Sequence, residues 1–351
     1  MDLSNTDNRI EALHGGDVYR NEVRLDYSVN LNPFPMPSEV TEAIRKGMTE
    51  IHQYPDPEQQ KLRERIAALE GMSYENIVCG NGASELMMAA VHAVMPRKAL
   101  ISSPCYAGYA VALKASDAEI KEYFPDEKKD FAVDDGILDH INDSTDMVFI
   151  ADPNNPNGRL IDPALKNAVI AKCGECGAVL MIDECFYPLT EAGAEAGAVT
   201  DNALHLRAFT KTFAIPGIRI GYMLSNDTKL LEKIRMHLPE WNVSRIAERT
   251  GEAAAGVLES TDYLKESVRM IEREREYLTQ KLRELGVKVY HSDTNYLLLK
   301  SAPGLYEKLL ERGILIRRCA NFNGLDDSYF RIAIRKHNDN KELINILGKV
   351  L

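Results

Sequence analysis

Between about residues 45 and 225, short apolar segments alternate with longer segments of helical pattern. Residues 147–150 and 179–182 are continuous apolar runs, which is typical of strands buried on both faces of a sheet. This alternation predicts an α/β fold in which a mostly parallel sheet carries helices on both faces. Ligands bind such folds at the carboxyl ends of the strands, so we expect the functional residues there.

A smaller α+β unit is predicted after this region. Residues 262–285 are rich in charge and place apolar side chains at helical spacing, and apolar runs that suit strands follow at 287–290, 295–299 and 330–334. The predicted parts are an N-terminal arm that packs against the small unit (1–44), a large cofactor-binding domain (45–235) and a small C-terminal domain (236–351). We expect the small domain to be free to close over substrate.

Residues 208–222 place one lysine and one arginine among small and turn-forming residues. A lysine amine in a desolvated pocket can lose its proton and form an imine with an aldehyde, which makes Lys211 a candidate catalytic residue. Arg219 stands eight residues further on and could bind a phosphate. The pair suggests pyridoxal 5′-phosphate as cofactor, and the alternative is a surface lysine with a structural arginine.

The apolar run 179–182 is followed directly by Asp183. At the carboxyl end of a buried strand, this carboxylate would lie at the ligand-binding edge of the sheet. Pyridoxal phosphate is an electron sink only while its pyridinium nitrogen keeps a proton, and an acid such as Asp183 stabilises that proton. The alternative is that Asp183 caps the next helix.

A glycine turn joins the apolar segment 77–79 to a strongly helical run. The backbone amides of Gly82, Ala83 and Ser84 would be exposed at the start of that helix, where the helix dipole favours a phosphate. Glu85 occupies the place of the third small residue of the dinucleotide fingerprint, so a dinucleotide is not indicated. An ordinary strand-to-helix turn remains the alternative.

Two further side chains stand in loops beside these predicted strands. Asn155, in the turn-forming segment 151–158, could donate from its amide to the phenolic oxygen of the cofactor or could form a plain Asx turn. Tyr106, in the segment 103–106, could stack on the pyridine ring or could be a half-buried loop residue.

Taken in chain order, these segments resemble the fold-type I pyridoxal-phosphate enzymes of the class I/II aminotransferase family over nearly the whole chain. The resemblance implies a large domain with a seven-stranded, mostly parallel sheet and a small α+β domain. It implies that Lys211 is the Schiff-base lysine, Asp183 the pyridinium partner and Tyr106 the stacking ring, with Asn155 as donor to the phenolate oxygen. The residues implied to hold the cofactor phosphate are Gly82, Ala83, Ser84, Thr210 and Arg219.

The resemblance also implies a homodimer with shared active sites. In this family the tyrosine that matches Tyr54 often reaches the cofactor phosphate of the neighbouring subunit. Tyr54 is therefore expected to bind the cofactor of the other chain.

Two branches of the family resemble the chain most, the threonine-phosphate decarboxylases and the histidinol-phosphate aminotransferases. The segments 14–16, 25–33 and 241–244 are similar to those of the decarboxylases. Phe186 also resembles the decarboxylases, because aminotransferases of the family usually have a tyrosine hydroxyl at this position. Tyr187 is the next residue, and on a strand its side chain would point in the opposite direction. The resemblance thus implies a decarboxylase for threonine phosphate or a close relative, in the aminopropanol branch of cobalamin biosynthesis.

Two other functions stay open. One is an aminotransferase that acts on histidinol phosphate or another amino acid with 2-oxoglutarate. The other, of a different class, is a sensor that binds pyridoxal phosphate and an amino acid without turnover, although no DNA-binding segment supports it.

Arg331 resembles the substrate-anion arginine of the family, since a guanidinium fork suits a carboxylate or a phosphate. Asn155 would also contact the substrate. Threonine phosphate carries two anions, which makes His14, Arg335 and Arg317 candidates for the second one.

Charge and cysteine content restrict the partners and the location. The formal net charge of −11 argues against nucleic-acid and anionic-membrane partners. Six cysteines in 351 residues do not suggest a disulfide framework, and the single CxxC at 173–176 does not suggest a metal site. The first residues lack the pattern of a signal peptide, and no apolar run approaches membrane-spanning length. We expect a cytoplasmic enzyme without a metal that acts on a small, phosphorylated amino-acid substrate.

Overall fold

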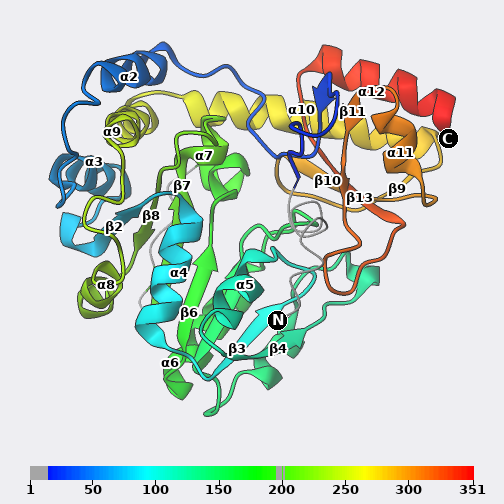
Figure 1. The fold of residues 1–351 in the computed structure, drawn as a ribbon. Helices are drawn as coiled ribbons and strands as arrows, with labels where there is room; N and C mark the ends of the chain where they lie inside the picture. The colour runs from blue at the N-terminus through cyan, green and yellow to red at the C-terminus, as the bar shows by residue number, and fades with distance from the viewer. Residues whose placement is uncertain (1–14, 195–199, 201) are drawn as a thin grey trace.

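A computed structural model describes residues 15–194, 200 and 202–351. Its largest sheet has seven strands in the order β2-β8-β7-β6-β5-β3-β4 (Figure 1). Neighbouring strands are parallel except at β8, which runs antiparallel to both β2 and β7. The strands are β2 (Ile77–Gly80), β3 (Lys98–Ser102), β4 (Glu119–Tyr123), β5 (Met147–Ala151), β6 (Val179–Asp183), β7 (Ala203–Ala208) and β8 (Gly221–Leu224). The prediction of a mostly parallel, seven-stranded sheet is confirmed.

Helices cover both faces of this sheet, as predicted (Figure 1). Met147 and Phe149 of β5 belong to the core beneath α4 (Ala83–Val94) and α5 (Gly108–Lys114). Val148 and Ile150 of the same strand belong to the core on the opposite face, beneath α6 (Pro163–Cys176). Because successive strand residues point to opposite faces, a strand covered on both sides needs the continuous apolar run seen in the sequence.

A second sheet has four antiparallel strands in the order β12-β13-β10-β9 (Figure 1). Its strands are β9 (Lys288–Val289), β10 (Tyr296–Lys300), β12 (Arg317–Arg318) and β13 (Tyr329–Ala333). Leu278, Phe330 and Leu343 belong to the apolar core between this sheet and its helices. The helices of this unit are α10 (Tyr263–Glu284), α11 (Leu305–Leu310) and α12 (His337–Val350), and α10 is the charge-rich helix predicted over 262–285.

The N-terminal part of the described chain joins the C-terminal unit. β1 (Leu25–Asp26) pairs in parallel with β11 (Ile314–Leu315). The backbone amide of Ala333 then donates to the carbonyl of Tyr27 at 2.9 Å. Residues just after β1 are thereby held beside the end of β13. The residue numbers at which the three predicted parts begin and end stay a prediction.

A group of helices flanks the β2 edge of the large sheet (Figure 1). α9 packs against both α2 and α3, and α8 contacts α4. A Cβ atom on Gly47 of α2 would lie 2.8 Å from the Cα atom of Ile246, so only glycine allows the two helices to approach this closely. The bounds of these helices are α2 (Ser38–Thr49), α3 (Gln60–Glu70), α8 (Thr228–Arg235) and α9 (Arg245–Ser260).

None of the helices in the described ranges combines the length and the apolar character that crossing a bilayer requires. The 22-residue α10, for example, carries glutamate and arginine along its whole length.

Candidate active site

A cavity of about 330 Å³ lies where the strand ends of the large sheet face the C-terminal sheet. Ala151, Asp183 and Ala208 line it as the last residues of β5, β6 and β7, and Arg317 and Arg331 line it from β12 and β13. The other predicted residues in its wall are Ala83, Ser84, Tyr106, Asn155, Phe186, Thr210, Lys211 and Arg219. The structure thus brings together side chains that are far apart in the sequence.

Gly82 and Tyr54 are absent from the wall of the cavity. Gly82 is the residue directly before α4, beside the cavity. Tyr54 has 81% of its surface exposed, and its ring lies against Trp241 with 5.0 Å between the centroids. His14 lies outside the described residues, whereas the following Gly15 lines the cavity.

Arg335, a predicted substrate contact, is held by residues outside the wall of the cavity. Its Nε donates to Asp339 Oδ2 at 3.0 Å, and its Nη1 donates to the carbonyl of Asp26 at 2.9 Å. Arg335 lies beyond the last residue of β13 and is absent from the wall of the cavity. Its guanidinium instead joins the N-terminal strand to α12.

Lys211 is the third residue of the single turn α7 (Phe209–Thr212), which directly follows β7. Its amine lies 5.7 Å from the centroid of the Phe186 ring. Burial by protein atoms lowers the pKa of Lys211 to about 8, and the positive charges of Arg331 and Arg219 act in the same direction. Its amine can therefore lose a proton at much lower pH than an exposed lysine, as nucleophilic attack on an aldehyde requires.

Each carboxylate oxygen of Asp183 accepts one hydrogen bond. The backbone amide of Cys185 donates to Oδ1 at 3.0 Å, and the hydroxyl of Tyr109 donates to Oδ2 at 2.7 Å. Tyr109 is buried, and its ring lies edge-on to Tyr106 with 5.5 Å between centroids. Tyr109 was not among the predicted site residues, although a second tyrosine three residues after Tyr106 was the available signal.

Gly82 and Gly221 form a cradle at the start of α4, and a side chain at either position would meet neighbouring atoms. Gly82 has a φ of +83°, and a Cβ atom there would lie 2.3 Å from Nη2 of Arg219. A Cβ atom on Gly221 would lie 2.9 Å from the backbone nitrogen of Ala83. Glycine at both places lets the arginine and the helix amides approach one point, as an anion site needs.

Glu85, which breaks the dinucleotide fingerprint, has a local role at this turn. Its Oε2 accepts from the backbone amide of Asn81 at 2.7 Å and from the side-chain amide of Asn242 at 2.8 Å. The carboxylate therefore fixes the glycine turn from the side.

Arg331 is 6% exposed and joins two walls of the cavity. Its Nη1 donates to Asn155 Oδ1, and its Nη2 donates to the carbonyl of Ser28 at 2.9 Å. Burial lowers the pKa of this guanidinium. Its Nε is buried without a hydrogen-bond partner among the described residues, which leaves a donor for a ligand.

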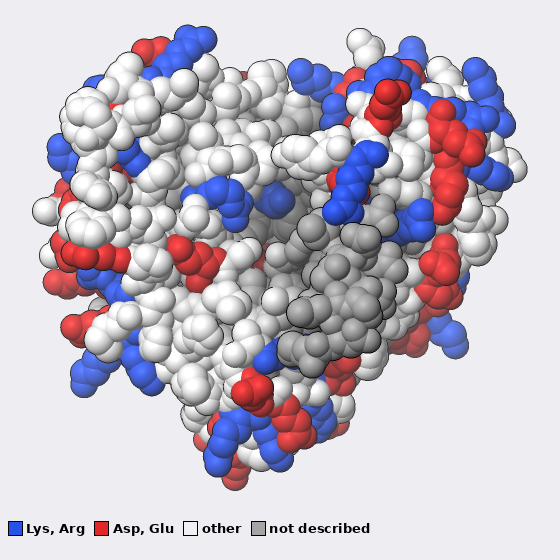
Figure 2. Space-filling model, in the orientation of Figure 1, with Lys and Arg blue, Asp and Glu red and all other residues white. Residues whose placement is uncertain are grey.

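Arg317 stands directly opposite Arg331 in the register of β12 and β13. It is 5% exposed, and its Nη2 donates to Asn321 Oδ1 at 2.8 Å. Burial, followed by the charge of Arg331, lowers the pKa of Arg317 to about 10. Within the described ranges, no carboxylate lies at ion-pair distance from either guanidinium. Figure 2 shows basic side chains at a hollow near the middle of the visible face.

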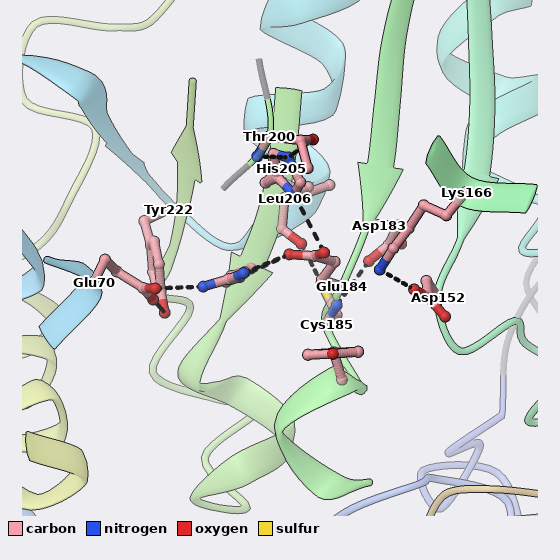
Figure 3. Close-up of polar contacts among 12 residues, drawn as sticks. Glu70, Asp152, Lys166, Asp183, Glu184, Cys185, Thr200, His205, Leu206 and Tyr222 are labelled. Carbon is pink, nitrogen blue, oxygen red and sulfur yellow. Dashed lines mark hydrogen bonds and ion pairs between the residues drawn. The ribbon is translucent and has the colours of Figure 1, made fainter. Parts of the chain in front are cut away.

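In a buried network near Asp183, carboxylates offset the charge of an arginine (Figure 3). Arg207 is buried like the two cavity arginines, but Glu70 and Glu184 both accept from its guanidinium. The hydroxyl of Tyr222 donates to Glu70 at 2.7 Å. Burial alone would raise the pKa of Glu184, but Arg207 and His205 outweigh it and lower this pKa to about 2. The charge of Arg207 is therefore neutralised within the protein, whereas those of Arg317 and Arg331 are not.

The sequence matches the model of the family described as aminotransferase class I and II over residues 23–347. The chain belongs to this family. It is 33% identical to the threonine-phosphate decarboxylase of Salmonella typhimurium over 93% of this chain and 91% of that protein. It is 31% identical to the histidinol-phosphate aminotransferase of Methanococcus aeolicus over 92% of this chain and 88% of that protein. The crystal structure of the histidinol-phosphate aminotransferase from Clostridium acetobutylicum has a TM-score of 0.84 at 33% identity and covers 93% of this chain and 98% of that chain.

Class I and II aminotransferases are enzymes that depend on pyridoxal 5′-phosphate, and the cavity of this member of the family fits that cofactor. It offers a lysine with a lowered pKa, a carboxylate at a strand end and a glycine cradle beside an arginine. These groups match the aldehyde, the pyridinium nitrogen and the phosphate of the cofactor.

Proposed function

We propose that this family member acts on a phosphorylated amino acid, as a decarboxylase for L-threonine-O-3-phosphate or a close relative that serves cobalamin biosynthesis. The observation that carries the proposal is the pair Arg317 and Arg331, two buried guanidiniums without carboxylate partners among the described residues. Buried charges are costly unless a partner offsets them, so the partner is expected in the ligand. A substrate with a carboxylate and a phosphate would supply two anions.

We assign the cofactor-binding roles by position. Lys211 would bind the aldehyde, Asp183 would hold the proton on the pyridinium nitrogen, and Tyr106 would stack on the ring. The side-chain nitrogen of Asn155 would donate to the phenolic oxygen while its side-chain oxygen accepts from Arg331. The groups that would bind the phosphate are Gly82, Ala83, Ser84, Thr210 and Arg219. The bound cofactor supplies an electron sink for charge that develops at the substrate Cα.

Phe186 supports decarboxylation over transamination. It lines the cavity, and its ring lies edge-on to Tyr296 with 5.0 Å between centroids. Tyr187 is absent from the wall of the cavity, and Lys166 Nζ lies 5.2 Å from its ring centroid. The described wall therefore presents an apolar ring where relatives that transaminate usually have a hydroxyl.

The test is to incubate cofactor-loaded protein with threonine phosphate alone, and separately with histidinol phosphate plus 2-oxoglutarate. We expect carbon dioxide from the first mixture and no glutamate from the second. Glutamate without carbon dioxide would instead identify an aminotransferase, the alternative that similarity to histidinol-phosphate aminotransferases keeps open. Product from neither mixture would reject both phosphorylated substrates.

We also propose a homodimer in which Tyr54 reaches the cofactor phosphate of the second subunit. Tyr54 is exposed, is absent from the wall of the cavity in its own chain, and lies against the partly exposed Trp241. An exposed aromatic pair of this kind is typical of a surface that another chain covers.

We propose the cytoplasm as the compartment. All six cysteines are unpaired, and five of them are buried, which suits a reducing environment. A thiol count of six in protein denatured directly from cells would support this location.

A further inference from the structure

Arg317 and Arg331 are both held by asparagine side chains. Asn155 Oδ1 accepts from Arg331, and Asn321 Oδ1 accepts from Arg317 at 2.8 Å. Arg207, which lies outside the cavity, instead contacts two glutamates. An amide oxygen fixes the direction of a guanidinium but carries no charge, so the full positive charge remains for a ligand.

Asn321 is itself held in place by a tight loop between β12 and β13. The backbone amide of Phe322 donates to the carbonyl of Cys319 at 2.9 Å, and the amide of Leu325 donates to the carbonyl of Phe322 at 3.0 Å. Phe322 lines the cavity, and the Arg317 guanidinium lies 5.3 Å from its ring centroid. The loop therefore places both the amide of Asn321 and the ring of Phe322 in contact with Arg317.

We propose that Asn321 is a positioning residue that orients Arg317 toward the second substrate anion and keeps that arginine uncompensated. An aspartate at the same position would make a stronger contact with Arg317 but would occupy the charge meant for the ligand. Specificity for a doubly anionic substrate thus depends on the residue at 321 being neutral. This inference rests on the proposed function, because it assigns a use to the same two arginines.

The variants Asn321→Asp and Asn321→Ala separate this role from a structural one. Asn321→Asp keeps the shape and the hydrogen bond to Arg317, so its melting temperature is expected to equal or exceed that of the wild type. Its affinity for inorganic phosphate, measured by calorimetry on cofactor-loaded protein, is expected to fall about tenfold. Asn321→Ala loses the hydrogen bond but adds no charge, so its affinity is expected to fall less.

A residue with a merely structural role gives the reverse order, with alanine as the more damaging change in both stability and affinity. That result, or equal phosphate affinity in Asn321→Asp and the wild type, would overturn the proposal. Ala320→Asp is the matched control, because it adds the same charge one residue away at an exposed position. An equal loss of affinity in Ala320→Asp would also overturn the proposal, since charge anywhere on the loop would then suffice.

Succinate as a second probe keeps this inference distinct from the proposed substrate. If the wild type binds succinate but not phosphate, the phosphorylated substrate is wrong, and the variants are then compared with succinate in the same order. A wild-type protein that binds neither anion would overturn the role of Asn321 whatever reaction the enzyme performs. In turnover, Asn321→Asp is expected to raise KM while kcat changes little, because Asn321 is in contact with a binding group only.

Discussion

At the scale of single residues, burial determines the pKa of Lys211. The folded protein lowers its pKa from 10.5 to about 8, so folding disfavours the charged amine. Stability is therefore reduced below pH 8, and the penalty disappears as pH rises from about 8 to about 10.5. The energy that reduces stability is what makes the amine reactive at lower pH.

Replacing Lys211 should therefore stabilise the protein once the cofactor is removed. At pH 7 we expect Lys211→Met to increase the unfolding free energy by roughly 2–3 kcal/mol, and we expect the gain to vanish near pH 10.5. Urea denaturation at both pH values measures this. Lys229→Met, at an exposed position, is the control and should have no effect. A variant at 211 that is less stable than the wild type at pH 7 would contradict the assignment.

Tyr109 is expected to affect turnover and cofactor binding because its hydroxyl holds the carboxylate of Asp183. Tyr109→Phe removes the donor to Oδ2 and leaves the carboxylate free to turn, so turnover and cofactor affinity are expected to fall about tenfold. Tyr123→Phe removes the hydroxyl that donates to Asp134 in a region away from the cavity, and it should change stability alone. Cofactor titration by visible absorbance distinguishes the two, and equal affinities would remove Tyr109 from the site.

At the scale of elements, the connection from β2 to α4 requires glycine at position 82, where φ is +83°. Gly82→Ala strains a backbone with a φ of +83° and also pushes a Cβ atom against Arg219, whereas Gly71→Ala strains a φ of +64° with no atom within 4 Å. We expect both variants to lose roughly 1–2 kcal/mol of stability, and only Gly82→Ala to lose cofactor affinity as well. Equal cofactor affinities would show that Arg219 does not need this cradle.

The sequence predicts residues whose place follows from a single element. Asp183 directly follows the apolar run 179–182, and the carboxyl ends of parallel strands meet at one edge of a sheet, so its place at the binding edge could be foreseen. Asn321 could not be foreseen, because its role depends on a hydrogen bond across a loop. The choice between Arg317 and Arg335 depends on where β13 ends and on which strand lies beside it, and neither can be read from periodicity.

At the scale of the whole molecule, a shared active site predicts complementation between inactive chains. Tyr54→Ala and Lys211→Ala should each be strongly impaired as homodimers. In a mixed dimer, one site combines the intact lysine of one chain with the intact tyrosine of the other. Dissociating, mixing and reassociating the two variants should therefore restore about a quarter of wild-type activity. Recovery that stays at the level of the separate variants would contradict the shared site.

The register of β12 and β13 fixes the distance between the backbones of Arg317 and Arg331. Directly opposed residues on antiparallel strands have Cβ atoms about 4.5–5.5 Å apart, so the backbone fixes the distance between the Cβ atoms of the two arginines. Under the proposed function, this backbone spacing limits the separation of the two substrate anions. A homologue that selects a longer or shorter substrate would have to move a strand or use a different pair of positions, and a slip of one residue would turn one guanidinium to the opposite face.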